Sequence, residues 1–436
     1  MGSGKRVLVM TVGTGGGVED GIARCIDDRR PDEVVFLVTA MSETKVKLVE
    51  EKARRMPSHR CVPVADHEEL SEAYRVARDV IRGVKRTQAD AEVEVDFTSG
   101  TKVMSAAAVL AGLAEDCRDF VYVGGGRRDS ETGRVTSGAE TLRTMRPYCV
   151  LADIWAQRAV ELFNAYEFQA ALAICERAVG GRDLPAFERR PFEVLAVLCR
   201  AYQSWDAFDL ETAARGFAEA RKAAGTQGID LHDAEQFPRF TENSEWVKRL
   251  NNLLTAFQRE EVGRRTFPLE FVVDVVANAD RRMEGGKWVD AVSRLYRAVE
   301  LVAQHVLSER YRIDTGAVNT DLIPAEAREK YEAYRDDSGR LRLGLEQAYS
   351  LLRDLNHPLG RCFFEAEAMR ARLRARNDSI AAHGLAPVTP EACRSLYEPV
   401  AEWLRELNAP IAQMKEQATF MRLSRGVLDC EGREDR

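Results

Sequence analysis

The sequence predicts an α/β domain followed by all-α regions that end in a helical bundle. Short β-branched apolar runs alternate with helical patterns over the first third of the chain, and helical spacing alone continues to the end. At 436 residues the chain is too long for one typical core. We therefore expect an α/β domain at 1–150, a helical connector at 151–264 and a helical bundle at 265–436.

The α/β region is predicted from four strand-like runs with helical patterns between them. The runs are short and mostly continuous in apolar character, as in parallel strands buried on both faces, so an open Rossmann-like sheet is expected. A polar stretch rich in turn formers, Arg127–Val135, is expected to form a hairpin tip. The predicted strands are Arg6–Thr11, Val34–Thr39, Val93–Thr98 and Phe120–Val123, and the predicted helices are Val18–Asp27, Ser42–Arg55, His67–Lys85 and Thr101–Ala114.

The middle region shows helical spacing over Trp155–Val179 and Phe192–Ala224. A short pattern occurs twice, as Phe168-x-x-Ala171 and as Leu210-x-x-Ala213, and is similar to the paired helices of a tetratricopeptide hairpin. Two weak copies do not make a solenoid, so a helical connector is the favoured interpretation.

The C-terminal region has amphipathic helical spacing and suits a bundle of four or five helices. Thr389 is expected to cap the last helix, with Pro390 at its first position. The last twenty or so residues are polar and are expected to fray. The predicted helices are Lys287–Tyr311, Leu341–Leu355, Phe363–His383 and Thr389–Met414.

The composition is that of an ordinary soluble protein, with 45% hydrophobic and 31% charged residues. The sequence has no apolar run long enough for a membrane span and no signal-peptide pattern, so a cytoplasmic protein without a membrane partner is expected. Nine single cysteines without C-x-x-C spacing indicate free thiols and no metal site. The net charge of −7 disfavours broad duplex binding but not a local phosphate site.

Two loops after predicted strands are candidates for binding an anionic ligand. Both are dense in Gly, Ser and Thr, and each leads into a helix N-terminus, where free amides favour anions. Neither matches a P-loop, and the dinucleotide pattern fails because Val18 replaces its third glycine. Alternatively, the glycines merely permit tight turns. The candidate binding residues are Thr11, Gly13, Thr14, Gly15, Thr98, Ser99, Gly100, Thr101 and Lys102.

Near the other end, Arg376-Asn377 is followed by His383 seven positions after the arginine, with Gly384 as a candidate helix cap. Seven residues bring two side chains back to nearly the same face of a helix. A guanidinium binds phosphate oxygens and an imidazole transfers protons near neutral pH, which is the minimum equipment for metal-free RNA cleavage. The alternative is an exposed Arg and a helix-terminal His that interacts with the helix dipole.

Other polar residues in the sequence have simpler explanations. Arg372 either contacts RNA or belongs to a solvated helix face, and Arg297 and Glu300 are explained equally well by site support or by an exposed ion pair. His67 and His357 are expected to be structural, as are the other histidines outside the Arg376–His383 pattern.

The two candidate sites together resemble a known family. Asp96-x-Thr98-Ser99-Gly100-Thr101-Lys102, with the Gly/Thr loop after the first strand, is similar to the CARF domain of CRISPR-associated proteins. Arg376-Asn377 with His383 in a helical bundle is similar to the HEPN ribonuclease domain. Both motifs in this order resemble the CARF–HEPN ribonucleases of type III CRISPR systems over nearly the full length, and the middle region matches least.

The resemblance implies a function and a mechanism. CARF domains dimerise and bind a cyclic oligoadenylate of four or six AMP units (cA4 or cA6), and the ring switches on a composite HEPN site that degrades single-stranded RNA without metal or cofactor. Arg376 would bind and stabilise the scissile phosphate, His383 would transfer a proton, and Asn377 would orient His383 or the phosphate. The protein would be a homodimer that acts in antiviral defence.

Two alternatives to a ring-activated nuclease remain open. One is a ligand sensor without RNase activity, a regulator or an adaptor, although no basic helix-turn-helix pattern follows Val150. The other is a CARF domain that cleaves the ring itself, because Thr11, Thr14, Thr101 and Lys102 could hold a ring phosphate. The sequence leaves the ring size open.

Overall fold

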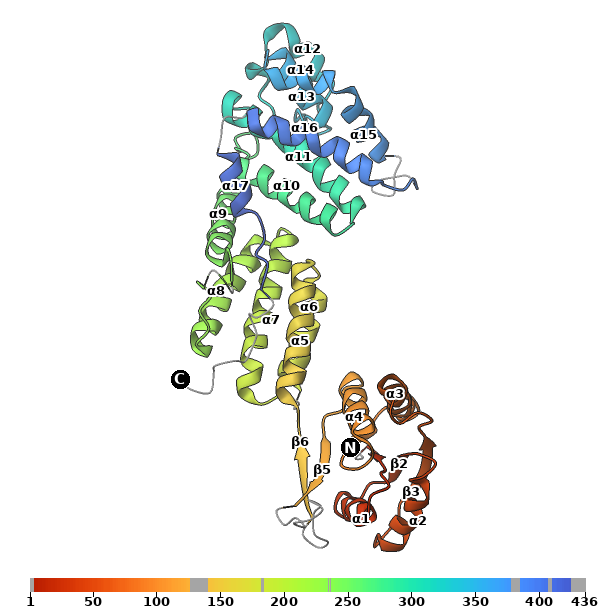
Figure 1. Ribbon diagram of the computed structural model, residues 1–436. Coiled ribbons are helices and arrows are strands. Elements are labelled where there is room, and N and C mark those ends of the chain that lie inside the picture. The colour runs from red at the N-terminus through yellow and green to blue at the C-terminus, as the bar shows by residue number, and fades with distance from the viewer. Residues whose placement is uncertain are drawn as a thin grey trace. The chain divides into compact units, whose positions relative to one another are not determined.

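The computed structural model describes residues 4–125, 140–181, 184–233, 235, 237–377, 385–406 and 410–424 (Figure 1). The chain divides into two compact units, unit 1 at Met1–Leu151 and unit 2 at Ala152–Arg436. Unit 1 is α/β and unit 2 is helical, so the predicted fold class is confirmed.

Unit 1 contains a six-stranded sheet with the order β3-β2-β1-β4-β5-β6. All neighbouring strands are parallel except β5 and β6, which are antiparallel. The central strand β1 pairs with β2 on one side and β4 on the other, so that Val9 lies between Val35 and Val95. The strands are β1 Arg6–Thr11, β2 Glu33–Val38, β3 Ser58–Pro63, β4 Glu92–Asp96, β5 Phe120–Gly124 and β6 Thr141–Met145.

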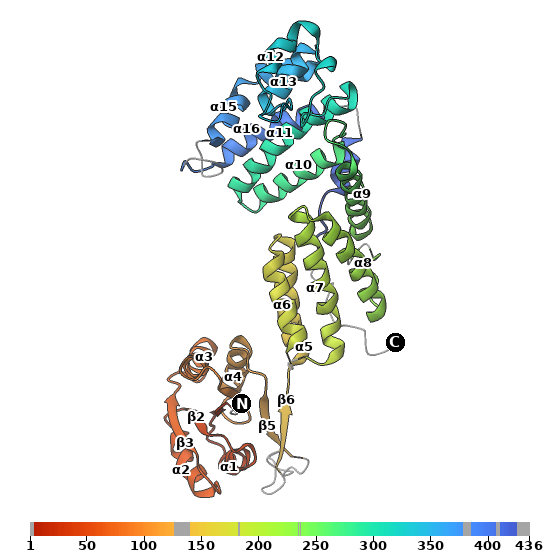
Figure 2. The ribbon, with the colours of Figure 1, turned by 180° about the vertical axis from the view of Figure 1, so that it is seen from behind.

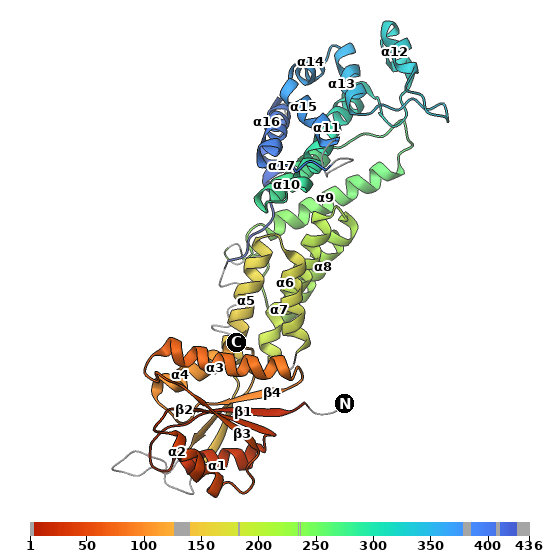
Figure 3. The same cartoon turned by 90° about the vertical axis from the view of Figure 1, so that its right-hand side faces the viewer.

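Helices cover both faces of this sheet (Figure 3). Side chains alternate along a strand, so Val7 and Val9 pack in one core with α3 and α4, and Leu8 and Met10 pack in another with α1 and α2. Burial on both faces explains why the central strands are continuous apolar runs in the sequence. The helices are α1 Val18–Arg29, α2 Glu43–Lys52, α3 Leu70–Thr87 and α4 Lys102–Ala114.

Two strands at the edges of the sheet were not predicted. In β3 no residue is fully buried, and in β6 four of the five residues are exposed. A strand at the edge of a sheet that is largely exposed to solvent does not need apolar side chains. The sequences of β3 and β6 therefore lack the apolar pattern by which the central strands were predicted. The predicted hairpin tip at Arg127–Val135 lies outside the described residues.

Unit 2 begins with antiparallel helices that pack side by side, α6 against α7 and α7 against α8 (Figure 2). A second group of helices follows, in which α11 packs against α10, α13 and α16. The first group is α5 Tyr148–Asn164, which starts before the unit boundary, α6 Phe168–Gly180, α7 Ala186–Asp206, α8 Leu210–Gln227 and α9 Phe240–Arg259. The second is α10 Leu269–Glu284, α11 Trp288–Tyr311, α12 Arg328–Glu332, α13 Leu345–Asp354, α14 Pro358–Glu365, α15 Glu367–Asn377, α16 Pro390–Glu406 and α17 Ile411–Gln417, with short 3-10 turns at Thr320–Leu322 and Ala325–Ala327.

Four helix pairs in unit 2 are joined by the same tight connection. A left-handed residue ends the first helix, and the next N–H donates back to the carbonyl oxygen five residues earlier, which is the Schellman motif. The left-handed residues are Tyr166, Phe208, Gly286 and Asn356. The returning bonds are Glu167 to Leu162, Asp209 to Ser204, Lys287 to Arg282 and His357 to Leu352, at 2.8–2.9 Å.

The Schellman connection explains why the short sequence pattern occurs twice in the middle region. Phe168 and Leu210 are the first residues of α6 and α8, and each is buried against the preceding helix. The helical spacing over Trp155–Val179 and over Phe192–Ala224 falls on two helices in each case, because the chain turns at Tyr166 and at Phe208. Trp288-x-x-Ala291 at the start of α11 is a further copy that the sequence analysis missed.

The C-terminal region contains one confirmation and two corrections. Thr389 caps α16 as predicted, because its hydroxyl accepts the Ala392 N–H at 3.3 Å. The predicted helix Phe363–His383 is interrupted at Ala366 between α14 and α15, and its part beyond Asn377 lies outside the described residues. The chain after α17 is not frayed up to Ser424, because Phe420 and its neighbours are buried among α7, α9 and α10.

Candidate functional site

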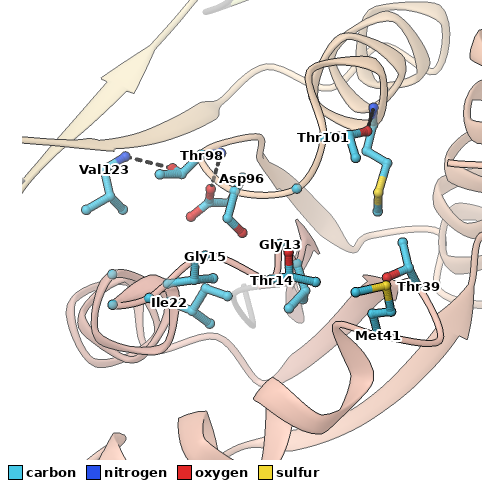
Figure 4. Close-up of a pocket in the computed structure, with 18 of the residues that line it drawn as sticks. Gly13, Thr14, Gly15, Ile22, Thr39, Met41, Asp96, Thr98, Thr101 and Val123 are labelled. Carbon is cyan, nitrogen blue, oxygen red and sulfur yellow. Dashed lines mark hydrogen bonds between the residues drawn. The ribbon is translucent and has the colours of Figure 1, made fainter. Parts of the chain in front are cut away.

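The two ligand loops lie together at the topological switch point of the sheet. β1 and β4 are adjacent and parallel, but α1 follows β1 on one face of the sheet while α4 follows β4 on the other. The loops therefore diverge at the carboxyl ends of the strands, where open α/β sheets bind ligands. The structure has a cavity of about 550 Å³ there (Figure 4).

Seven of the nine predicted binding residues line this cavity, and two lie outside its lining. Thr11 is buried beneath the loops, and Lys102 is exposed at the first position of α4. The seven that line it are Gly13, Thr14, Gly15, Thr98, Ser99, Gly100 and Thr101.

Reciprocal hydrogen bonds hold the two loops against each other. The Thr11 hydroxyl donates to the Ser99 carbonyl oxygen, and the Ser99 hydroxyl donates to the Thr11 carbonyl oxygen. The backbones come so close that a Cβ on Gly13 would lie 2.7 Å from the Gly100 nitrogen. Gly100 itself has a φ of 98°, which L-residues rarely adopt. Thr11 therefore shapes the site from below.

The hydroxyls of the second loop are largely used to build it. Thr98 Oγ1 accepts the Val123 N–H at 2.7 Å, and its own N–H donates to Asp96 Oδ1 at 2.8 Å. Thr101 caps α4 through Met104 and donates to the His67 carbonyl oxygen at 2.8 Å. These bonds fix the loop before any ligand binds.

The backbone amides of the first loop provide donors for an anion. Within the described part of the chain, the N–H groups of Gly13–Gly17 have no protein acceptor. The loop leads into α1 as the second leads into α4, so two helix N-termini face the same cavity. Free amides and helix dipoles at one point are typical of a phosphate site.

The charge of the cavity comes from few side chains. Among the described residues that line it there is no Lys or Arg, and His67 is the one basic side chain. His67 was expected to be structural; it reaches the cavity because β3 and the loop after it extend the same edge of the sheet. The unpredicted strand β3 is the reason the sequence analysis missed it.

Asp96 lies in the wall of this cavity and is only 2% exposed. Burial raises the pKa of its carboxyl group, and hydrogen bonds from Thr98 and the Cys25 thiol oppose that rise only in part. Its Oδ2 atom has no hydrogen-bond partner among the described residues. Burial of this carboxyl group, with one oxygen unsatisfied, therefore favours its neutral form more than in an exposed aspartate.

The predicted catalytic residues lie at the edge of the described chain. Arg376 and Asn377 are the last two residues of α15, and the structure does not describe their side chains or that of Arg372. His383 and Gly384 lie outside the described residues. Among the α15 residues whose side chains are described, Met369 is buried, and α15 packs against the neighbouring helices α14 and α16.

Two other predictions about polar residues can be examined directly. Arg297 donates to Glu300 Oε2 at 2.5 Å and also to Gln304 Oε1 at 3.0 Å, so the ion pair, one of the two alternatives, is present. His357 accepts the Leu359 N–H at the start of α14, and burial together with Arg310 lowers its pKa. A structural role for His357 is confirmed.

The described residues contain no group of three or more His, Cys, Asp or Glu side chains arranged to hold a metal ion. None of the helices that the structure describes is both long and apolar enough to cross a membrane.

Two family models match the helical part of the chain, and one curated relative covers most of its length. Residues 151–254 match the family model described as the Csm6 6H domain, and residues 260–407 match that of the Csm6 HEPN domain. The CRISPR system endoribonuclease Csm6 of Thermus thermophilus is 27% identical over 376 residues, which cover 78% of this chain and 74% of that protein.

One solved structure shares the fold over almost the whole chain, and a second is similar over about half of it. Enterococcus italicus Csm6 bound to cyclic hexa-2′-fluoro-hexa-dAMP superposes with a TM-score of 0.51 at 13% identity, covering 95% of this chain and 99% of that one. Can2 of Sulfobacillus thermosulfidooxidans in complex with cyclic tetra-adenylate gives a TM-score of 0.23 at 12% identity, covering 50% of this chain and 68% of that one.

An α/β ligand domain followed by a helical region and a HEPN domain defines a CRISPR-associated CARF–HEPN protein. The two adjacent domain models together match more than half of the chain. The chain belongs to the Csm6 family of CRISPR endoribonucleases.

Proposed function

We propose that this protein is an endoribonuclease that a cyclic oligoadenylate activates, and that it degrades single-stranded RNA in type III CRISPR antiviral defence. The observation that carries the proposal is the amide-rich cavity at the switch point of unit 1, in the same chain as a Csm6 HEPN domain. The cavity provides a phosphate site far along the sequence from Arg376 and His383, as regulation by a second ligand requires.

Ring phosphates would bind mainly to backbone groups. The amides of Gly13–Gly17 and the N-termini of α1 and α4 would face the phosphates, with His67 as the basic side chain in the lining. A ring of four or six AMP units carries a phosphate at every link, and one pair of loops offers donors for only part of it. We therefore propose a homodimer in which two cavities face one ring across a two-fold axis.

The RNA reaction would need no metal. The 2′-hydroxyl attacks the adjacent phosphorus while its proton is removed, the P–O5′ bond breaks, and the leaving 5′-oxygen takes a proton. The products are a 2′,3′-cyclic phosphate and a 5′-hydroxyl end. His383 would transfer protons, Arg376 would stabilise the charge on the phosphorane oxygens, and Asn377 would orient His383 or the phosphate.

The proposal is tested by incubating the purified protein with labelled single-stranded RNA and cA4, cA6 or a linear oligoadenylate. We expect one ring to activate cleavage, and we expect the activity to persist in EDTA. His383→Ala should lose cleavage and keep ring binding in a direct binding assay. Cleavage that no ring stimulates would contradict activation by a cyclic oligoadenylate. Cleavage that EDTA abolishes would contradict a metal-free reaction, and full cleavage by His383→Ala would contradict the role of His383.

A second candidate function is cleavage of the ring in unit 1. His67, whose side chain is able to transfer protons, lines the same cavity as Thr14 and Thr101. Labelled ring incubated with His383→Ala in the absence of RNA would be shortened over time if unit 1 cleaves it. An intact ring would leave unit 1 as a sensor only.

A further inference from the structure

A second cavity lies within unit 2, where four helical elements meet. It measures about 280 Å³ and is enclosed by the turn after α7 together with α9, α10 and α11. These elements come from both the 6H and the HEPN parts of the chain. None of the residues that line the cavity belongs to either proposed site.

One wall of this cavity is aromatic. Phe271 contacts Phe208 with ring centroids 5.8 Å apart, and Phe257 contacts Phe267 at 4.9 Å. Phe267 and Phe271 are buried, whereas Phe208 and Phe257 are half-buried. The Arg265 guanidinium lies over the Phe257 ring, 5.0 Å from its centroid. A half-buried ring that lines a cavity can offer its remaining face to a planar ligand.

The lining also contains two arginines one turn apart on α11. Arg294 donates through Nε to Asn278 Oδ1 at 3.2 Å, which holds its guanidinium in place. Arg297 donates through Nη1 to Glu300 and Gln304. A guanidinium has five N–H donors, so these contacts leave others free to bind an anion.

The acidic residues near these arginines do not cancel their charge. Asp206 also lines the cavity, but it is paired with both Arg281 and Arg282. Glu300 pairs with Arg297, and no acidic residue is paired with Arg294 among the described salt bridges. The lining of the cavity therefore combines aromatic rings with an arginine, Arg294, that no described salt bridge neutralises.

We propose that this cavity binds one unpaired nucleobase of the RNA substrate, stacked on Phe208 and Phe257, with the adjoining phosphate at Arg294 and Arg297. The inference rests on the proposed function in taking single-stranded RNA as the substrate. A cavity of about 280 Å³ admits a single splayed base and excludes a duplex. Aromatic stacking combined with arginine is the usual way in which proteins hold single strands without reading their sequence.

An apolar side chain from a second copy of the chain is the competing occupant. It would use the aromatic wall but would leave Arg294 without an anion, whereas a nucleotide satisfies both sides of the cavity. RNA is therefore favoured by charge as well as by shape.

The test compares two oligonucleotides on the full-length protein. Both are single-stranded and 2′-O-methylated, so the 2′-hydroxyl attack is blocked; one carries bases and the other has the same backbone with abasic positions. Phe257→Leu keeps an apolar side chain but removes the ring. It should weaken binding of the base-containing strand by about fivefold or more and leave the abasic strand unchanged. Phe187→Leu is the matched control, because Phe187 is 49% exposed on α7 and does not line the cavity.

A second variant probes the phosphate contact and does not depend on the aromatic wall. Arg294→Gln should weaken both strands and reduce the slope of log affinity against log salt by roughly one. Arg264→Gln, at an arginine whose side chain is 81% exposed and outside the lining, should change neither.

The outcomes separate this inference from the proposed function. Equal effects of Phe257→Leu on the two strands, or no effect on either, would overturn the base site while RNA binding stands. If Phe257→Leu changes the oligomeric state seen by sedimentation, the cavity is a contact between copies of the chain, and the proposed base site is wrong. Failure of the wild-type protein to bind either strand, with or without ring, would overturn both the RNA substrate and this cavity. If Phe257→Leu does not fold, the test rests on Arg294→Gln. A slope of log affinity against log salt equal to that of the wild type would then reject the site.

Discussion

At the scale of single residues, the ligand loops depend on glycine for a steric reason. A Cβ on Gly13 would meet the Gly100 nitrogen at 2.7 Å, and that neighbour is backbone held by Thr11 and Ser99. Gly13→Ala should therefore shift the loops, destabilise unit 1 by about 1–3 kcal/mol and raise the ring concentration needed for activation.

The matched control for this prediction is Gly83→Ala. An added Cβ on Gly83 meets nothing within 4 Å inside α3, so this change should stabilise the helix by about 0.5–1 kcal/mol. Urea unfolding and ring titration of both variants check the prediction. Normal activation by Gly13→Ala would show that the close approach of the loops is not needed for binding.

Asp96 gives a prediction about pH. Burial raises the pKa of its carboxyl group above the ordinary value, so the folded state binds a proton more strongly than the unfolded state does. The free energy of unfolding should therefore fall as the pH rises from about 4 through the raised folded pKa, and the penalty should persist above it. Asp96→Asn cannot ionise, so its stability relative to the wild type should increase over that interval.

Urea unfolding of wild type and Asp96→Asn across this pH range measures the difference. Asp79→Asn is the control, because the Arg78 hydrogen bond lowers the pKa of that exposed carboxyl group. Parallel stability curves for wild type and Asp96→Asn would mean that Asp96 does not titrate in this interval.

At the scale of elements, one carboxylate joins helices of the 6H part to the HEPN part. Asp274 Oδ1 on α10 accepts the indole N–H groups of Trp205 on α7 and Trp246 on α9, each at 3.0 Å. All three side chains are buried. Asp274→Ala would leave two buried donors without an acceptor and should cost about 2–6 kcal/mol of stability.

Asp274→Asn should cost less than Asp274→Ala, because its amide oxygen still accepts. Asp290→Ala, at an exposed position on α11, should change stability by no more than about 0.5 kcal/mol. Denaturant unfolding of the full chain ranks the three variants. If Asp274→Ala is as stable as Asp290→Ala, water must accept the two indole N–H groups in place of the Asp274 carboxylate.

At the scale of the whole molecule, the proposed allostery requires that ring affinity and the rate of RNA cleavage can be changed separately. Lys102 lies outside the lining of the cavity in one chain and is exposed. If it contacts a ring phosphate, Lys102→Ala should raise the half-maximal ring concentration by about tenfold and leave the rate at saturation nearly unchanged.

Lys47→Ala is the control for this titration, since Lys47 is an exposed lysine on α2. It should not change the activation curve. An unshifted midpoint for Lys102→Ala would remove Lys102 from the ligand site and leave the amides and His67 to bind the phosphates.

The sequence alone determined the parallel α/β sheet, the two loops beyond β1 and β4, and the helical character of the remainder. Central strands are buried on both faces, so their apolar runs are readable from the sequence, and glycine-rich turns before helices carry their own local chemistry. Seven of the nine predicted loop residues line one cavity for this reason. The roles of Arg376, Asn377 and His383 stay predictions.

Only the tertiary structure decided the features that depend on distant contacts. The edge strand β3, exposed enough to lack an apolar pattern, brings His67 to the ligand cavity. The described part of the C-terminal segment, up to Ser424, packs against the helices because Phe420 is buried against Trp205 and Arg281. Phe208 and Arg294 meet at one cavity although 86 positions separate them. Such meetings follow from packing between helices, which local sequence patterns do not encode.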